Sequence, residues 1–241
     1  METETTYGTL YLIPTPLGEN PPLEVLPLSV KTKLEHLNHF IVENEKAARR
    51  FIKKLAPNKS QEALKLYPLN KFTTQEEMAS YLNPCFEGHQ MGLMSDAGTP
   101  GVADPGASIV ANAHKAGVTV KPFAGPSSII LAMMSSGMNG QSFAFNGYLP
   151  VDQRQRKQAL IKFEKKATRE NQAQIFIETP YRSTALLKDL LGSLLPTTLL
   201  CIACDLTLTT EFVKTLTVKA WKQQKPQLDK RPCIFIIEAG F

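Results

Sequence analysis

Short apolar runs alternate with helical patterns along the first half of the chain. Four runs have the length and composition of buried strands: residues 8–16 (GTLYLIPTP), 39–44 (HFIVEN), 90–95 (QMGLMS) and 118–123 (VTVKPF). Helical patterns occur at residues 24–37, 45–55, 73–81 and 107–116, the last ending before Gly117. This alternation predicts a mostly parallel sheet covered by helices.

The second half of the chain is richer in strands. Five runs are typical of strands: residues 142–149 (SFAFNGYL), 172–179 (QAQIFIET), 199–208 (LLCIACDLTL), 211–218 (EFVKTLTV) and 233–240 (CIFIIEAG). Helices are predicted at residues 127–136, 154–168 and 182–191. We therefore expect an α/β protein of two domains, with a mostly parallel N-terminal α/β domain over residues 1–123 and a mixed α/β domain over residues 124–241.

Composition and charge narrow the class of protein only a little. The chain has 241 residues, 43% of them hydrophobic, and its formal net charge of +5 is below that of a dedicated nucleic-acid module. The N-terminal METETTYG has no apolar signal region, and no apolar run approaches the ~18 residues of a membrane span. We expect a cytoplasmic protein without a membrane segment.

The cysteines do not form a recognisable metal site. Cys201 and Cys204 make a C-x-x-C pattern, which could be a redox pair or half of a zinc site. They fall in a strand-like run, where residues three apart face opposite sides, and no second Cys or His pair has matching spacing. We predict a structural role for the pair, free thiols at all four cysteines and no bound metal.

Two loops rich in small residues follow predicted strands. Residues 95–106 (SDAGTPGVADPG) carry Asp96 directly after an apolar run, and residues 124–128 (AGPSS) lead into a helix. In open parallel sheets, ligands bind beyond the carboxyl ends of the strands, where such loops converge. The chain has no P-loop and no G-x-G-x-x-G after its first strand, which disfavours a phosphate-rich nucleotide. These loops suit S-adenosylmethionine, and they would equally suit ordinary tight turns of an α/β sheet.

A resemblance adds specificity to these loops. The segments GTLYLIPTPLG, SDAGTPGVADPG, AGPSS, FNGYLP, FIETPYR and FIIEAG span nearly the whole chain. Together they resemble the tetrapyrrole methylase superfamily, the class III S-adenosylmethionine-dependent methyltransferases, and within it the rRNA small subunit methyltransferase I branch. The resemblance implies two α/β domains, a methyl donor that leaves as S-adenosylhomocysteine, and a homodimer.

The resemblance also implies a set of residues that hold the donor. Carried over position by position, they are Asp96, Ala97, Gly98, Thr99, Pro100, Gly125, Pro126, Ser127 and Ser128 from the two loops, with Ile177, Thr179 and Ala203 from the C-terminal half. Gly98 is expected to lie against the donor, where a side chain would not fit.

Three carboxylates are candidates for a catalytic base. Methyl transfer from a sulfonium needs mainly alignment, but a hydroxyl acceptor benefits from a proton acceptor. Glu43, Asp104 and Glu178 are the candidates by position, and each could equally be a cap or an ion-pair partner.

The substrate motifs of the rRNA branch are altered. Its G-N-L-x-D becomes Gly18 to Pro22 (GENPP), its E-D-T-R becomes Glu43 to Lys46 (ENEK), and its R-E-L-T-K becomes Cys204 to Leu208 (CDLTL), losing two cations. Basic side chains that could contact phosphates gather at Lys46, Arg49, Arg50, Lys53 and Lys54, and at Arg154, Arg156, Lys157, Lys162, Lys165, Lys166 and Arg169, although such runs are also typical of solvated helix faces.

These observations together favour an S-adenosylmethionine-dependent methyltransferase that acts on RNA, with a ribosomal subunit as partner. The altered motifs predict a nucleotide or atom other than the ribose 2′-hydroxyl that is the usual target of the branch. Two alternatives stay open: a methyltransferase for a tetrapyrrole or another small molecule, and a non-catalytic sensor that binds the donor.

Overall fold

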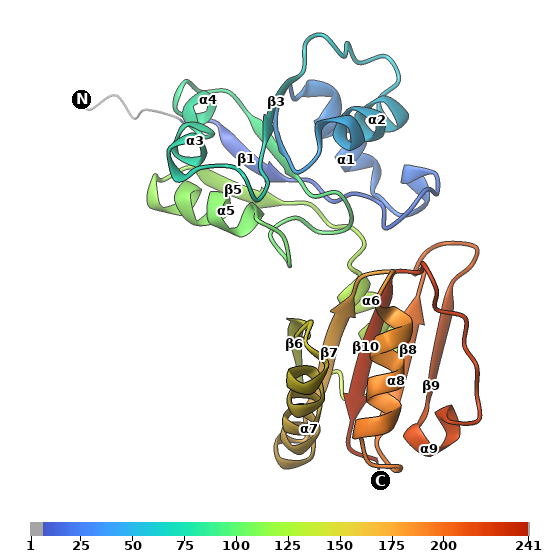
Figure 1. The fold of residues 1–241 in the computed structure, drawn as a ribbon. Helices are drawn as coiled ribbons and strands as arrows, with labels where there is room; N and C mark the ends of the chain where they lie inside the picture. Colours follow the sequence, from blue (N-terminus) through green and yellow to red (C-terminus); the bar gives the residue numbers. More distant parts are fainter. Residues whose placement is uncertain (1–6, 241) are drawn as a thin grey trace. The chain divides into compact units, whose positions relative to one another are not determined.

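The computed structural model describes residues 7–240 and divides into two compact units (Figure 1). Unit 1 is Met1–Ser127 and unit 2 is Ser128–Phe241, so the division falls four residues after the boundary expected from the sequence. Each unit has its own five-stranded sheet and its own helices. Within the described residues, no helix is both long and apolar enough to cross a bilayer.

Unit 1 is built on a parallel sheet of strand order β3-β2-β4-β1-β5. Its strands are β1 (Thr9–Leu12), β2 (His39–Val42), β3 (Lys65–Pro68), β4 (Met91–Met94) and β5 (Thr119–Pro122). Its helices are the 3-10 turn η1 (Pro22–Glu24), α1 (Leu28–His36), α2 (Glu45–Leu55), α3 (Gln75–Ser80), α4 (Asn83–Phe86) and α5 (Gly106–Lys115).

Both faces of this sheet are covered, which explains why its central strands are apolar apart from His39 at the start of β2. Every residue of β2 and β4 is buried. Successive residues point into different cores: Phe40 and Val42 pack with helices α1 and α2, whereas Ile41 packs with α5 on the other side. Polar groups are therefore confined to the ends of these strands.

Unit 2 contains a mixed sheet of strand order β6-β7-β10-β8-β9. Only β6 and β7 run parallel, and the other neighbours are antiparallel. The strands are β6 (Phe143–Tyr148), β7 (Ala173–Glu178), β8 (Leu199–Cys204), β9 (Phe212–Thr217) and β10 (Cys233–Glu238). The helices are α6 (Ser128–Ser136), α7 (Gln153–Glu170), α8 (Ser183–Ser193) and α9 (Val218–Trp221).

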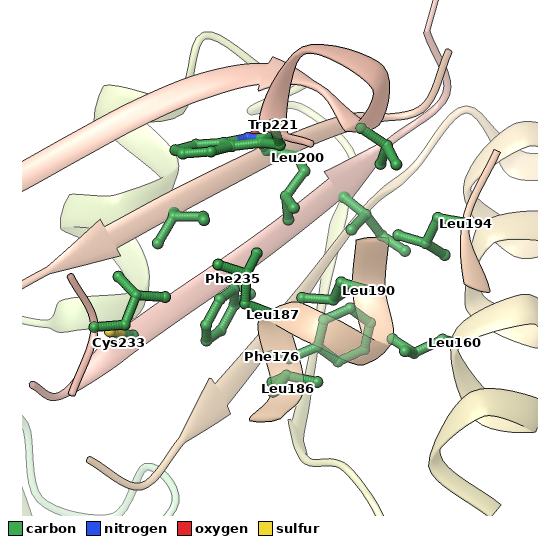
Figure 2. Close-up of a cluster of buried hydrophobic side chains, with 14 of the residues drawn as sticks. Leu160, Phe176, Leu186, Leu187, Leu190, Leu194, Leu200, Trp221, Cys233 and Phe235 are labelled. Atoms are coloured by element: carbon green, nitrogen blue, oxygen red, sulfur yellow. The ribbon is translucent and has the colours of Figure 1, made fainter. Parts of the chain in front are cut away.

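One large hydrophobic core lies between this sheet and helices α7, α8 and α9 (Figure 2). Phe176, Phe235 and Trp221 are its largest buried side chains, and the Trp221 indole donates a 2.7 Å hydrogen bond to the Leu200 carbonyl. Alternate residues of β10, such as Ile234 and Ile236, are buried on the opposite face, where α6 packs (Figure 1). Both faces of β10 are thus covered, as its unbroken apolar sequence requires.

The structure confirms the predicted fold class, a mostly parallel N-terminal sheet followed by a mixed C-terminal one. Strand β3 was not predicted from the sequence. Its residues, Lys65–Pro68, have little apolar character, and the strand lies at the edge of the sheet. Cys201 and Cys204 do face opposite sides of β8, as the period of two predicts, because only Cys204 joins the core beside α8.

A matched pair of leucine substitutions tests the core of unit 2. Leu190 on α8 is fully buried, and Leu195, just after that helix, is 60% exposed. Leu190→Ala is expected to lower the free energy of unfolding by about 2–5 kcal/mol, and Leu195→Ala by less than about 0.5 kcal/mol. Denaturant titration measures both, and equal losses for the two variants would contradict this packing.

Candidate functional site

A hollow of about 130 Å³ opens at the carboxyl ends of strands β1, β2 and β4 in unit 1. Each of these strands ends in a polar loop, because the buried strand itself cannot hold charged groups. The lining includes Thr15, Leu17, Asn20, Glu43, Arg50, Phe51, Lys54, Ser95, Asp96 and Ala97. This is the edge at which open parallel sheets bind ligands.

The loop after β4 is shaped by Asp104. Its carboxylate accepts hydrogen bonds from the backbone N–H groups of Gly101, at 2.8 and 3.0 Å, and Gly106, at 2.7 Å. Burial raises the pKa of Asp104 even though these bonds favour the charged form. Because its oxygens are occupied in closing the loop, Asp104 has a structural role in this geometry.

Gly98 is required by the backbone of the same loop. It lies in the left-handed region, with φ of +79°, and exchanges two hydrogen bonds with Thr15, at 2.9 and 3.1 Å. A Cβ on Gly98 would come within 3.2 Å of Leu17 Cδ2 and 3.5 Å of the Pro126 carbonyl oxygen. The glycine therefore brings the loops after β1, β4 and β5 together, and its positive φ is strained for any residue with a side chain.

Glu43 and Asp96 form a pair of carboxyls beside the hollow. Glu43 Oε1 accepts a 3.0 Å hydrogen bond from the Asp96 backbone N–H, which orients the glutamate. Burial raises the pKa of both side chains, and the negative charge of Asp96 raises that of Glu43 further. A partly buried carboxyl with a raised pKa, lining a concave site, has the properties of a proton acceptor.

Glu178 has a different environment in unit 2. It is buried at the end of β7, where Arg182 Nε and Nη2 donate to its two oxygens at 2.9 and 2.7 Å. The Thr179 backbone N–H adds a third bond at 2.7 Å. Arg182 binds both carboxylate oxygens in a forked ion pair. Glu178 is therefore better explained as an ion-pair partner than as a catalytic base.

Unit 2 brings two further candidate donor residues together. Ile177 on β7 and Ala203 on β8 both stand opposite Ile234 of β10, so the three form one row across the sheet. The row lies on the face that α6 covers. The Thr215 side chain on β9 donates to the Ser136 carbonyl at the end of α6, and Thr215 stands opposite Cys201, two residues along β8 from Ala203.

Thr15, Leu17, Phe51 and Ser95 of the hollow were not singled out from the sequence, whereas Arg50 and Lys54 were named there as possible phosphate contacts. Arg50 forms a 2.9 Å ion pair with Glu19, and Lys54 donates to the carbonyl oxygens of Glu19 and Asn20 at 3.1 and 3.2 Å. These contacts tie the loop after β1 to α2, and no sequence pattern marks them. The Asn20 side-chain amide is buried, and within residues 7–240 neither its nitrogen nor its oxygen has a hydrogen-bond partner.

The described residues offer no metal centre. Within residues 7–240, no group of three or more His, Cys, Asp or Glu side chains is arranged to hold a metal ion.

Comparison with curated proteins places the chain in a family. It is 30% identical over 205 residues to the ribosomal RNA small subunit methyltransferase I of Vibrio cholerae serotype O1, a match that covers 85% of this chain and 67% of that protein. The chain belongs to this methyltransferase family. The family member of the same name from Halalkalibacterium halodurans is 32% identical over 197 residues, covering 79% of the chain and 64% of that relative. The chain thus spans about two thirds of these relatives' length, and no model of a protein family matches it.

Solved structures share the fold of this chain. The methyltransferase CobJ has a TM-score of 0.64 at 18% identity, over 96% of this chain and 94% of that chain. A uroporphyrin-III C-methyltransferase from Thermus thermophilus, complexed with S-adenyl homocysteine, has a TM-score of 0.57 at 16% identity, over 96% and 97% of the two chains. The predicted family and fold are confirmed.

Glu43→Gln tests the electrostatics of the hollow. Because the pKa of Glu43 is raised on folding, the folded state favours its protonated form, and this contribution to stability is lost as the pH rises through the raised pKa. Glu43→Gln, which stays neutral, is therefore expected to be more stable than wild type at pH 7, with no gain below about pH 4.

Urea denaturation at the two pH values measures this difference. Glu45→Gln, on the exposed first turn of α2, is the control and is not expected to be stabilised. A loss of stability in Glu43→Gln at pH 7 would show that the ionised carboxylate stabilises the fold, contrary to this account.

Proposed function

We propose that the protein transfers a methyl group from S-adenosylmethionine to RNA of the small ribosomal subunit. The observation that carries the proposal is the Glu43–Asp96 carboxyl pair at the strand-end hollow of a chain in the rRNA small subunit methyltransferase I family. The proposed substrate class comes from the names of the relatives. The proposed proton acceptor comes from the carboxyl groups that line the hollow.

The described residues fit the methyl donor. Bound S-adenosylmethionine supplies an electrophilic methyl group on a cationic sulfur. In unit 1 the Asp96 carboxylate attracts cationic groups, and the loop of Ala97, Gly98, Thr99 and Pro100 offers backbone polar groups next to Gly125 and Pro126. In unit 2, Ile177 and Ala203 present an apolar row suited to a purine face. The resemblance adds Thr179, Ser127 and Ser128 as polar groups toward the donor.

Glu43 is the proposed proton acceptor. Its carboxylate is oriented by the Asp96 backbone N–H, and its raised pKa moves it toward the working pH, where a base is most effective. The proton of the acceptor nucleophile passes to a Glu43 oxygen as that nucleophile attacks the methyl group. Asp104 and Glu178 support the loop and the strand end instead.

The hollow has the size and polarity to receive one nucleobase ring. Its volume of about 130 Å³ is close to the ~150 Å³ cavity that holds a benzene ring in a well-studied engineered protein. The unpartnered Asn20 amide offers one donor group and one acceptor, the pair with which Asn recognises a base edge. Because Asn20 and Glu19 belong to the altered GENPP loop, we propose that the methylated position differs from the ribose 2′-hydroxyl usual in the family.

The cationic face of α7 is the proposed contact for RNA phosphates. Lys162, Lys165 and Arg169 are exposed along it. Arg156, counted among these cations from the sequence, is excluded, because it is buried and forms a 2.6 Å ion pair with Asp189. The homodimer implied by the resemblance and the cytoplasmic location expected from the sequence complete the proposal.

A labelled-methyl assay tests the reaction. The wild-type protein is expected to move tritium from S-adenosylmethionine into small ribosomal subunits taken from a strain that lacks the protein, and not into a small-molecule extract. Glu43→Gln should lower the rate by about 10²- to 10⁴-fold, while Glu45→Gln stays near wild type. Label found only in the extract would replace RNA by a small acceptor, and donor binding without any transfer would indicate a sensor.

Salt dependence tests the RNA contact. Lys162→Ala combined with Lys165→Ala should weaken RNA binding and reduce the slope of log K against log salt by about 1.4, the value for two single-strand phosphate contacts. The control is Lys219→Ala combined with Lys225→Ala, which removes the same charge from other exposed positions of unit 2. Equal slopes for the two double variants would show that net charge, and not the α7 face, attracts RNA.

A further inference from the structure

Two cysteine side chains meet inside unit 2. Cys204 is the last residue of β8 and Cys233 is the first residue of β10, and the antiparallel register places them directly opposite each other. Both are buried, and their sulfur atoms are 2.6 Å apart. Figure 2 shows Cys233 at one end of the hydrophobic cluster.

The sheet geometry suits a covalent bond between them. Opposite residues of an antiparallel pair have Cα atoms about 4.5–5.5 Å apart, within the ~4.4–6.8 Å that a disulfide spans. Both side chains belong to the same core, so they project from the same face of the sheet. Cys201 projects from the other face of β8, and Cys85 belongs to the core of unit 1, so neither can substitute for a member of the pair.

The surroundings make the two thiols unequal. The hydrogen bond from Cys204 lowers the pKa of Cys233, and the Arg231 cation acts in the same direction, while burial opposes both. The pKa of Cys204 is raised by the same bond and by burial. Cys233 is therefore the member that more readily forms the thiolate, the nucleophilic species.

The two buried cysteines have exposed or partly exposed neighbours in the sequence. Pro232, the residue before Cys233, is exposed, and Arg231 is held by a 2.7 Å ion pair to Asp205, the residue after Cys204. Local opening of these two strand ends gives a small oxidant access to the sulfurs without unfolding the rest of the sheet.

We propose that Cys204 and Cys233 are a redox-active pair that closes to a disulfide with a peroxide and reopens with a thiol reductant. The Cys233 thiolate attacks one peroxide oxygen, the O–O bond breaks, and the leaving hydroxide takes a proton to become water. The Cys204 sulfur then attacks the Cys233 sulfenic acid, the S–O bond breaks, and a second water leaves with the Cys204 proton. Two thiols and one hydrogen peroxide thus give one disulfide and two waters.

Mass spectrometry of the full chain tests the proposal. After treatment with hydrogen peroxide, the protein should lose two hydrogen atoms, and peptide mapping without reductant should join the peptides that contain Cys204 and Cys233. Dithiothreitol should reverse the change. The bond closes a loop between residues 29 apart, so the oxidised protein should melt about 5 °C or more above the reduced one.

Three serine variants complete the experiment. Cys204→Ser and Cys233→Ser should each abolish the bond and the rise in melting temperature, and Cys201→Ser, a buried control on the same strand, should keep both. Circular dichroism of the reduced variants identifies any that fail to fold, and Cys204→Ala and Cys233→Ala then replace them. Oxidation of wild type that only adds oxygen, or a bond that survives in Cys204→Ser, would overturn the proposal.

Discussion

The covering of the unit 1 sheet on both faces is the constraint from which the site follows. Strands β2 and β4 are buried along their whole length and are apolar apart from His39 at the start of β2, which is hydrogen-bonded to the Tyr67 hydroxyl. Because the strands are parallel, their first polar residues emerge at one common edge. Glu43 follows Val42 directly and Asp96 follows Met94 by two positions, and there the Glu43 carboxylate accepts a hydrogen bond from the Asp96 backbone N–H. The chemistry of the site is thus a consequence of where the core ends.

The three candidate carboxylates, Glu43, Asp104 and Glu178, differ in their hydrogen-bond partners and therefore in their roles. Asp104 accepts three contacts from backbone N–H groups and closes its loop, while Glu178 is held in a forked ion pair by Arg182. Glu43 accepts one backbone bond and faces a hollow in which burial raises its pKa. The distinction depends on which hydrogen-bond donors the fold brings to each oxygen.

Changes in the substrate motifs have structural counterparts in both units. In unit 1, Glu19 of the altered loop pairs with Arg50, and Asn44 caps α2 by accepting from the Ala47 backbone N–H. In unit 2, Cys204 stands where the family motif has a cation and packs against Cys233 in the core. The altered positions are therefore integrated into the fold of each unit.

The sequence by itself determined the alternation of strands and helices, the glycine-rich loops and the family. Runs such as HFIV and CIFIIE predicted strands. The loop motifs resembled those of the family to which the chain belongs. The edge strand β3 was missed because its residues are not apolar enough to register as a buried run. Only the tertiary structure decided that Arg156 is buried, that Gly98 is needed for a bridge to Thr15, and that Cys204 meets Cys233 rather than Cys201. These are contacts between residues far apart in the chain, and they depend on strand register and side-chain direction, which local sequence patterns do not encode.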